Sequence, residues 1–411
     1  MLITPPLSLY VHLPWCVRKC PYCDFNSHAL KTGLPEAEYA AALLRDLDQD
    51  LPRVTGRRVE TVFFGGGTPS LFKPESIARI LNGIRRHVSV AADAEITLEA
   101  NPGTVERGRF AEYQAAGITR LSIGVQSFNT RHLETLGRIH SADEAIRAAE
   151  EAYAAGLTNF NLDLMYGLPE QNIAQACADV EQALSLEPAH ISHYQLTLEP
   201  NTLFYTRPPV LPDDELIWQM QQACQALLAE NAYAQYEISA YALTGQQCRH
   251  NLNYWRYGDY LGIGAGAHGK LTDVPQDRIL RLWKLKHPDA YLHAAGTPAG
   301  IGAVTEIAND DRIFEFMLDR LRLLEGFSAL DFESLTGLPF SHTRPALEQI
   351  QAQGLLQVTN GQWKPTLRGH TYLNDLQAHF LPNAKTPSRQ ELATREIGWQ
   401  PLAASQTRPA R

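Results

Sequence analysis

Long apolar runs are missing from this chain of 411 residues, and their absence sets the first limits on what it is. No segment approaches the ~18 uninterrupted apolar residues that indicate a membrane span. Residues 1–6 contain neither a basic patch nor an apolar run, so we expect no secretory signal and a cytoplasmic location. An excess of positive charge is missing too, because 36 basic residues face 45 acidic ones. We therefore expect no nucleic-acid partner, since such partners are held by neutralising phosphates.

Cysteine is also scarce, with six in the chain, and this excludes a disulfide scaffold. Three of the six lie within eight residues of each other, from Cys16 to Cys23. In a cytoplasmic protein such clustering indicates metal or redox chemistry. Hydrophobic residues make up 44% of the sequence, which is enough for a sizeable core, and the length suggests two or three domains.

Short β-rich runs alternate with helix-like stretches along the first half of the chain. The predicted strands cover residues 8–15, 61–65, 95–100, 120–126, 160–165 and 190–198. Between them, stretches such as 36–50, 74–87 and 142–155 carry apolar residues at helical spacing. This alternation predicts an α/β fold with a parallel sheet. Six such units without a dinucleotide-binding fingerprint predict a partial (β/α)6 barrel, whose reactive groups would lie at the C-terminal ends of the strands.

The remaining sequence predicts three further segments after a barrel of residues 1–205. Residues 206–305 form a connecting region with a helix at 214–230, a strand-like run at 235–242 and a glycine-rich stretch at 262–269. Residues 306–380 form a small helical domain that ends in a hairpin at Asn360-Gly361 and resembles a winged helix. Residues 381–411 are predicted to be disordered. Five basic residues against two acidic ones in this tail leave a peripheral contact with an acidic membrane surface as an expectation.

The strongest signal is the motif Cys16-x3-Cys20-x2-Cys23 directly after the first predicted strand. Three thiolates around a [4Fe–4S] cluster leave one iron without a protein ligand, and that iron can bind an outside molecule. A zinc site is the alternative, with His12 or His28 as the fourth ligand. The least favoured interpretation is that the three cysteines are unrelated free thiols.

This motif, with Tyr22 just before the last cysteine, resembles the radical S-adenosylmethionine (SAM) superfamily. The resemblance implies that the amino and carboxylate groups of SAM chelate the open iron. One electron from the cluster then splits the sulfonium into methionine and a 5′-deoxyadenosyl radical. Cys16, Cys20 and Cys23 would be the metal ligands, and Tyr22 would join the cofactor-binding residues.

Polar or glycine residues follow the other predicted strands. Taken singly, each is more often a tight turn or a satisfied polar group, but together they fit the strand-end rule for barrels. By the resemblance, Gly66, Gly67 and Thr68 receive the methionine part of SAM. The other SAM contacts that the resemblance implies are Tyr10, Glu99, Gln126, Arg138 and Asp163.

Within the superfamily the chain resembles the branch of oxygen-independent coproporphyrinogen dehydrogenase, with two departures. Phe25 stands where the dehydrogenase has a further cysteine, and only 15 residues precede Cys16, fewer than in the dehydrogenase. We therefore lean against an enzyme, and keep a radical SAM oxidoreductase acting on a porphyrinogen as the alternative.

Several longer strings resemble a sister group of heme chaperones instead. They lie at residues 8–28, 99–103, 124–128 and 211–214. This resemblance implies a protein that keeps the cluster and SAM, binds heme, and delivers it to respiratory heme proteins. The sequence does not identify the electron donor.

The string His250-Asn251-Leu252-Asn253-Tyr254-Trp255 carries the heme expectation. A neutral imidazole is a good axial ligand for heme iron, and the two aromatic rings could flank a flat macrocycle. From chemistry alone a packed histidine is the commoner reading, but the resemblance implies that His250 is the heme ligand. Cys248 is a second candidate.

Overall fold

The computed structural model describes residues 1–31, 33–103 and 108–382. Most of the tail predicted to be disordered therefore lies outside the described residues. In the described part of the chain, the dominant feature is a twelve-stranded sheet with the order β14-β13-β12-β11-β1-β4-β5-β6-β7-β8-β10-β9. No helix in this part is both long enough and apolar enough to cross a bilayer.

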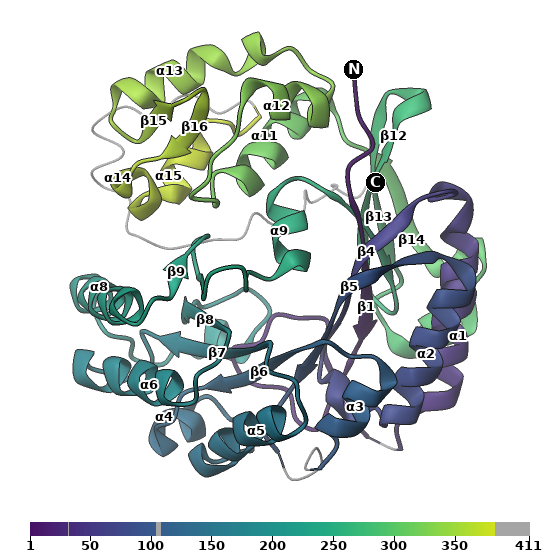
Figure 1. Ribbon diagram of the computed structural model, residues 1–411, viewed down its shortest axis with the longest axis vertical. Coiled ribbons are helices and arrows are strands. Elements are labelled where there is room, and N and C mark those ends of the chain that lie inside the picture. Colours follow the sequence, from purple (N-terminus) through teal and green to yellow (C-terminus); the bar gives the residue numbers. More distant parts are fainter. Residues whose placement is uncertain (32, 104–107, 383–411) are drawn as a thin grey trace.

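Six neighbouring parallel strands of this sheet form the partial barrel that the sequence predicts (Figure 1). They follow one another in chain order because each strand is joined to the next by a helical crossover. Their apolar residues are buried on both faces, as in parallel sheets generally. The strands are β1 (Leu7–Leu13), β4 (Arg58–Gly66), β5 (Ser89–Ala100), β6 (Arg120–Gln126), β7 (Phe160–Tyr166) and β8 (His190–Gln195).

The crossover helices cover the outer face of the curved sheet (Figure 1). Two of them end at the predicted residues, and α5 and α6 begin with capping boxes at Ser141 and Asn172. The inner face of the sheet is thereby left for the site. The helices of this half of the chain are α1 (Glu36–Asp50), α2 (Pro74–His87), α3 (Phe110–Ala116), α4 (Thr130–Thr135), α5 (Ala142–Ala154), α6 (Ile173–Ser185), α7 (Leu203–Thr206), which lies against the cysteine loop, and α8 (Asp214–Glu230).

The segment predicted as a connecting region extends the sheet at both edges. The strand-like run at 235–242 is two short strands with a turn between them, in which the Ser239 N–H donates to Glu237. At the other edge, β11 pairs in parallel with β1, and three antiparallel strands follow. The elements are β9 (Ala234–Gln235), β10 (Ala240–Ala242), α9 (Arg249–Trp255), β11 (Asp259–Ile263), β12 (His268–Asp273), β13 (Arg278–Lys284), α10 (Pro288–Ala294) and β14 (Ile301–Glu306).

The C-terminal unit has its own hydrophobic core and a two-stranded hairpin, as expected for a winged-helix-like domain. Positive φ angles at Asn360 and Gly361 make the hairpin turn. Leu2 belongs to this core, so the first residues of the chain tie the unit to the barrel. Its elements are α11 (Asn309–Arg320), α12 (Ala329–Thr336), α13 (Arg344–Ala352), β15 (Leu356–Thr359), β16 (Gln362–Pro365), α14 (Leu367–Thr371) and α15 (Leu373–Ala378).

Candidate functional site

One cavity of about 390 Å³ inside the barrel is lined by the thirteen residues that the sequence assigned to the cluster, SAM and the first heme-ligand candidate. They come from strand ends, from the cysteine loop and from α9, segments that are far apart in the chain. The structure therefore brings the predicted residues together, at the end of the sheet where barrels place reactive groups. The set is Tyr10, Cys16, Cys20, Tyr22, Cys23, Gly66, Gly67, Thr68, Glu99, Gln126, Arg138, Asp163 and His250.

The three cysteines lie on a loop that starts in the short strand β2 (Trp15–Cys16) and returns through β3 (His28–Ala29). Burial raises the pKa of Cys16 to about 11 and also raises the pKa of Cys23, so without a bound metal both remain thiols at neutral pH. Arg138 points Nη1 at the Cys20 sulfur, 3.7 Å away. A cation beside a sulfur favours the thiolate that a metal requires.

The donor set suits an iron–sulfur cluster better than a zinc ion. In the described part of the chain, no three His, Cys, Asp or Glu side chains converge closely enough to hold one metal ion. His12, a fourth ligand in the zinc alternative, already uses Nδ1 on the Tyr10 hydroxyl and Nε2 on the Asn26 carbonyl. Three sulfurs spread around one cavity match the separate corners of a cluster.

Gly66 and Gly67 owe their place to close packing. A Cβ at Gly66, where φ is +118°, would lie 2.6 Å from the His12 ring, and a Cβ at Gly67 would lie 2.5 Å from the Trp15 carbonyl oxygen. Because no side chain intervenes, the backbone of this turn borders the cavity. The Gly66 N–H donates to Glu99 Oε2 at 3.1 Å.

Two partly buried carboxyl groups, Glu99 and Asp163, line the cavity. Burial, with a smaller contribution from the charge of Asp163, raises the pKa of Glu99 to about 8. Burial also raises the pKa of Asp163, against hydrogen bonds from Asn161 and Ser122. In the described residues no Lys, Arg or His forms an ion pair with either group. Such carboxyl groups fit a ligand that brings its own ammonium group or hydroxyls.

Arg138 and Gln126 are held rigidly beside the cysteines. Arg138 Nη2 donates to Asn101 Oδ1 and to the Gly124 carbonyl, each at 2.6 Å. Its buried Nε has no partner, although the group is close to the cysteine loop. Gln126 has a φ of +73° and accepts a hydrogen bond from Tyr194. A guanidinium placed in this way can bind a ligand carboxylate.

Helix α9 forms the remaining wall of the cavity with His250, Asn251 and Tyr254. His250 is only 1% exposed, and its ring stacks on Phe63 at 4.9 Å. Burial lowers the pKa of His250 to about 3, so the imidazole is neutral. Cys248, the second heme-ligand candidate, is buried with its sulfur 3.6 Å from Glu95 Oε1 and does not line the cavity.

Sequence reasoning missed several cavity residues on the barrel strands. Ser122, Gly124 and Gln126 alternate along β6, and the same period of two recurs in β7 and β8. This alternation shows which residues share one face of a strand, but it does not tell which face lies inside the barrel. The missed side chains are Asn101, Arg120, Ser122, Asn161, His190, Ser192 and Tyr194.

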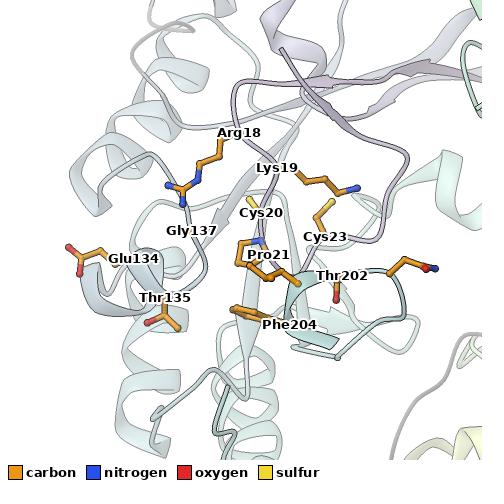
Figure 2. A pocket seen from close by; sticks show the side chains of 12 residues that line it. Arg18, Lys19, Cys20, Pro21, Cys23, Glu134, Thr135, Gly137, Thr202 and Phe204 are labelled. Atoms are coloured by element: carbon orange, nitrogen blue, oxygen red, sulfur yellow. The ribbon is translucent and has the colours of Figure 1, made fainter. Parts of the chain in front are cut away.

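A second hollow of about 520 Å³ lies on the other side of the cysteine loop. Figure 2 shows the Cys20 and Cys23 side chains bordering it, with Phe204 opposite them. Arg18 and Lys19 supply positive charge to its lining, and Glu134 supplies a negative charge. Cys20 and Cys23 line both the inner cavity and this outer hollow.

Comparisons with known proteins agree with this geometry. The Radical SAM superfamily matches residues 10–183, and the HemN C-terminal domain matches residues 307–371. "Heme chaperone HemW" of Escherichia coli K12 is 51% identical over 381 residues, which is 93% of this chain and all of that protein. "Heme chaperone HemW" of Haemophilus influenzae is 50% identical and covers 92% of the chain and 98% of that protein.

Among solved structures, coproporphyrinogen III oxidase (HemN) of Escherichia coli superposes with a TM-score of 0.78. The superposition covers 92% of this chain and 90% of that one, at 23% identity, and so supports the fold. Fold and site together define a radical SAM protein with a HemN-type C-terminal domain. Within that class, the chain belongs to the heme chaperone HemW family.

Proposed function

We propose that the protein is a heme chaperone that holds a [4Fe–4S] cluster, SAM and heme, and passes heme to respiratory heme proteins. The observation that carries the proposal is the α9 wall, which brings the His250 segment into the same cavity as the cysteines. The relationship to proteins named heme chaperone HemW over 93% of the chain supports it. We further propose that the transfer takes place in the cytoplasm, with the basic tail contacting acidic membrane surfaces.

The residues have distinct parts in this proposal. Cys16, Cys20 and Cys23 hold the cluster, and a bound cluster with SAM supplies one-electron cleavage of a carbon–sulfur bond. Glu99 and Asp163 accept hydrogen bonds from the ammonium and hydroxyl groups of SAM, and Arg138 binds its carboxylate. Gly66, Gly67 and Thr68 line the path of its methionine part. Tyr10, Tyr22 and Gln126 complete the cofactor walls.

The alternative is a radical SAM oxidoreductase that acts on a porphyrinogen. It has the cluster and SAM site in its favour. Against it stands Phe25 at the position of the fourth cysteine of the dehydrogenase. Its ring is 61% exposed, so it occupies the position without making a buried contact that would replace the missing thiol.

Two incubations of the anaerobically reconstituted protein separate the proposals. With ferric heme, we expect a stoichiometric complex that survives gel filtration and that transfers its heme to an apo-respiratory heme protein. With SAM, a reductant and coproporphyrinogen III, we expect no decarboxylated product by chromatography. Decarboxylation together with no retained heme would establish the oxidoreductase and overturn the chaperone.

The cluster ligands are tested in the same preparation. Alanine at Cys16, Cys20 or Cys23 should remove bound iron and sulfide, because a cluster held by three thiolates is not retained by two. Cys177→Ala is the matched control, since this cysteine lies on α6, away from the cavity. Unchanged iron and sulfide content in all three loop variants would contradict the ligand assignment.

A further inference from the structure

A chain of four hydrogen-bonded side chains runs from the core of the sheet to the cavity wall at α9. The Thr61 hydroxyl on β4 donates to Ser8 Oγ on β1 at 2.8 Å. Thr61 Oγ1 also lies 2.7 Å from His250 Nδ1, and His250 Nε2 lies 3.0 Å from the Tyr254 hydroxyl. Ser8, Thr61 and His250 are buried, whereas Tyr254 is partly exposed and lines the cavity.

We infer the direction of the hydrogen bonds in this chain from its buried end, where the Thr61 hydroxyl donates to Ser8. Because Thr61 gives its only hydrogen to Ser8, it accepts from His250, and the imidazole hydrogen therefore sits on Nδ1. Nε2 is then an acceptor, and the Tyr254 hydroxyl donates to it. The lone pair of the ring nitrogen is already engaged, while the lone pairs of the Tyr254 oxygen remain. In the described part of the chain, no hydrogen bond is donated to that oxygen.

Packing holds the two side chains in this relation. His250 and Tyr254 are four residues apart on α9 and share one face of the helix. The His250 ring is fixed between Phe63, which stacks on it, and the edge of Tyr254 at 4.8 Å. On its far side Tyr254 meets Tyr260 edge to face at 4.5 Å. Both side chains border the cavity, and Tyr254 is the more exposed of the two.

We propose that the Tyr254 oxygen, rather than a ring nitrogen of His250, is the axial ligand of the heme iron. The inference rests on the proposed heme function and names the donor atom at that site. Tyrosine is an established ligand of heme iron. The iron would take a lone pair of the oxygen, and the hydroxyl proton would pass along the hydrogen bond to His250 Nε2, which leaves a phenolate ligand. His250 is then a positioning residue that orients the ligand, as partners of metal ligands commonly do.

Ferric heme titrations of the full-length protein with resonance Raman spectra test this assignment. We expect iron–phenolate bands in the wild type, and these should shift when the protein is made with ring-deuterated tyrosine. Tyr254→Phe should lose the bands and bind heme more weakly than any other variant. His250→Gln keeps a hydrogen-bonding side chain beside the tyrosine oxygen, so it should retain the bands with about 10-fold weaker affinity. Tyr260→Phe, a neighbouring ring outside the cavity lining, should leave both readouts unchanged.

The outcomes separate the ligand assignment from the function it rests on. An imidazole-type spectrum that survives in Tyr254→Phe and disappears in His250→Gln would overturn the assignment and leave the heme function standing. The isotope shift is measured on the wild-type protein, so it tests the ligand assignment even if the Tyr254→Phe variant fails to fold. A wild-type spectrum with no shift would contradict the assignment. No heme binding by the wild type would overturn both.

Discussion

At the residue scale, the cavity combines groups that are costly to bury with an opening for ligands that would satisfy them. In the described residues neither Glu99 nor Asp163 forms an ion pair, although the charge of Arg120 acts on Asp163, and Arg138 has an unpaired Nε. Buried polar groups are normally satisfied, and exceptions in a native structure need an explanation. A ligand that brings an ammonium group and a carboxylate would pair with all of them. The site therefore gives up stability in the free protein for affinity toward that ligand.

Glu99→Gln tests this exchange. The pKa of Glu99 rises from its ordinary value of 4.5 to about 8 on folding, so the folded protein holds a proton that the unfolded chain releases across that range. Stability of the free wild type should therefore fall as pH rises from about 4.5 to about 8. The variant should melt a few degrees above the wild type at pH 8, with little difference near pH 4.5, and should bind SAM more weakly.

The matched control for that experiment is Glu75→Gln, because Glu75 is exposed on α2 and has no part in the cavity. Its melting temperature relative to the wild type should be insensitive to pH. Equal SAM affinity in Glu99→Gln and the wild type, measured by calorimetry, would remove Glu99 from the SAM site.

At the scale of single elements, α9 depends on a residue from a distant strand. Cys248 precedes this seven-residue helix and gives no side-chain cap to its N-terminal amides. Instead, Glu95 of β5 accepts from the Arg249 N–H at 3.2 Å and from the His250 N–H at 3.0 Å. A carboxylate at this position satisfies amides that the helix leaves unpaired and interacts favourably with the helix dipole. Glu95 therefore fixes the height and rotation of the whole α9 wall.

Glu95→Ala removes both acceptors, and we expect it to lower the free energy of unfolding by about 1–2 kcal/mol. Heme affinity should fall as well, because α9 is no longer held against the barrel, whereas SAM binding should change little. Urea denaturation and ligand titrations measure the two effects. Glu60→Ala is the control, since Glu60 pairs only with exposed Arg58. A Glu95→Ala protein with wild-type heme affinity would show that the carboxylate does not position the wall.

The elements also show which parts of the fold could be read from the sequence. The six barrel strands and helices such as α1, α2 and α8 were predicted closely, because local apolar patterns encode them. The edge strands β11 to β14 were not predicted. Their pairing joins β1 to β11, segments about 250 residues apart, and no local pattern records such a contact. The turn that divides 235–242 into two strands was also missed.

The cavity was predictable to the extent that its residues follow strand ends or belong to motifs. Glu99, Gln126 and the cysteines could be found in that way. His190, Ser192 and Tyr194 could not, because a strand tells which residues share a face but not which face is inside. The hydrogen-bond partners of His250 could not be predicted either, since Thr61 lies 189 residues away from it in the sequence.

At the scale of the whole molecule, the C-terminal domain contacts α9 from the side opposite the barrel. Arg322 lies over the Trp255 ring at 4.2 Å and pairs with Glu237 at 2.9 Å. Arg256, just after α9, forms a two-pronged pair with Glu325. Helix α9, which carries His250 and Tyr254, is thus held between the barrel and the C-terminal domain, and its position depends on both.

Arg322→Ala should weaken the contact between the C-terminal domain and α9. Glu237 is only 4% exposed and would lose its cation, which costs up to about 3–5 kcal/mol of folding stability. Arg344→Ala, which breaks the exposed pair with Glu348, should cost no more than about 1 kcal/mol. Guanidinium denaturation compares the two variants. Equal stability losses would mean that Arg322 is not a structural link between the domains.

The cysteine loop is a partition between two compartments, because Cys20 and Cys23 face the barrel cavity on one side and the outer hollow on the other. These two sulfurs therefore border a second space besides the cavity. A small molecule in the outer hollow can meet them even when the barrel cavity is filled.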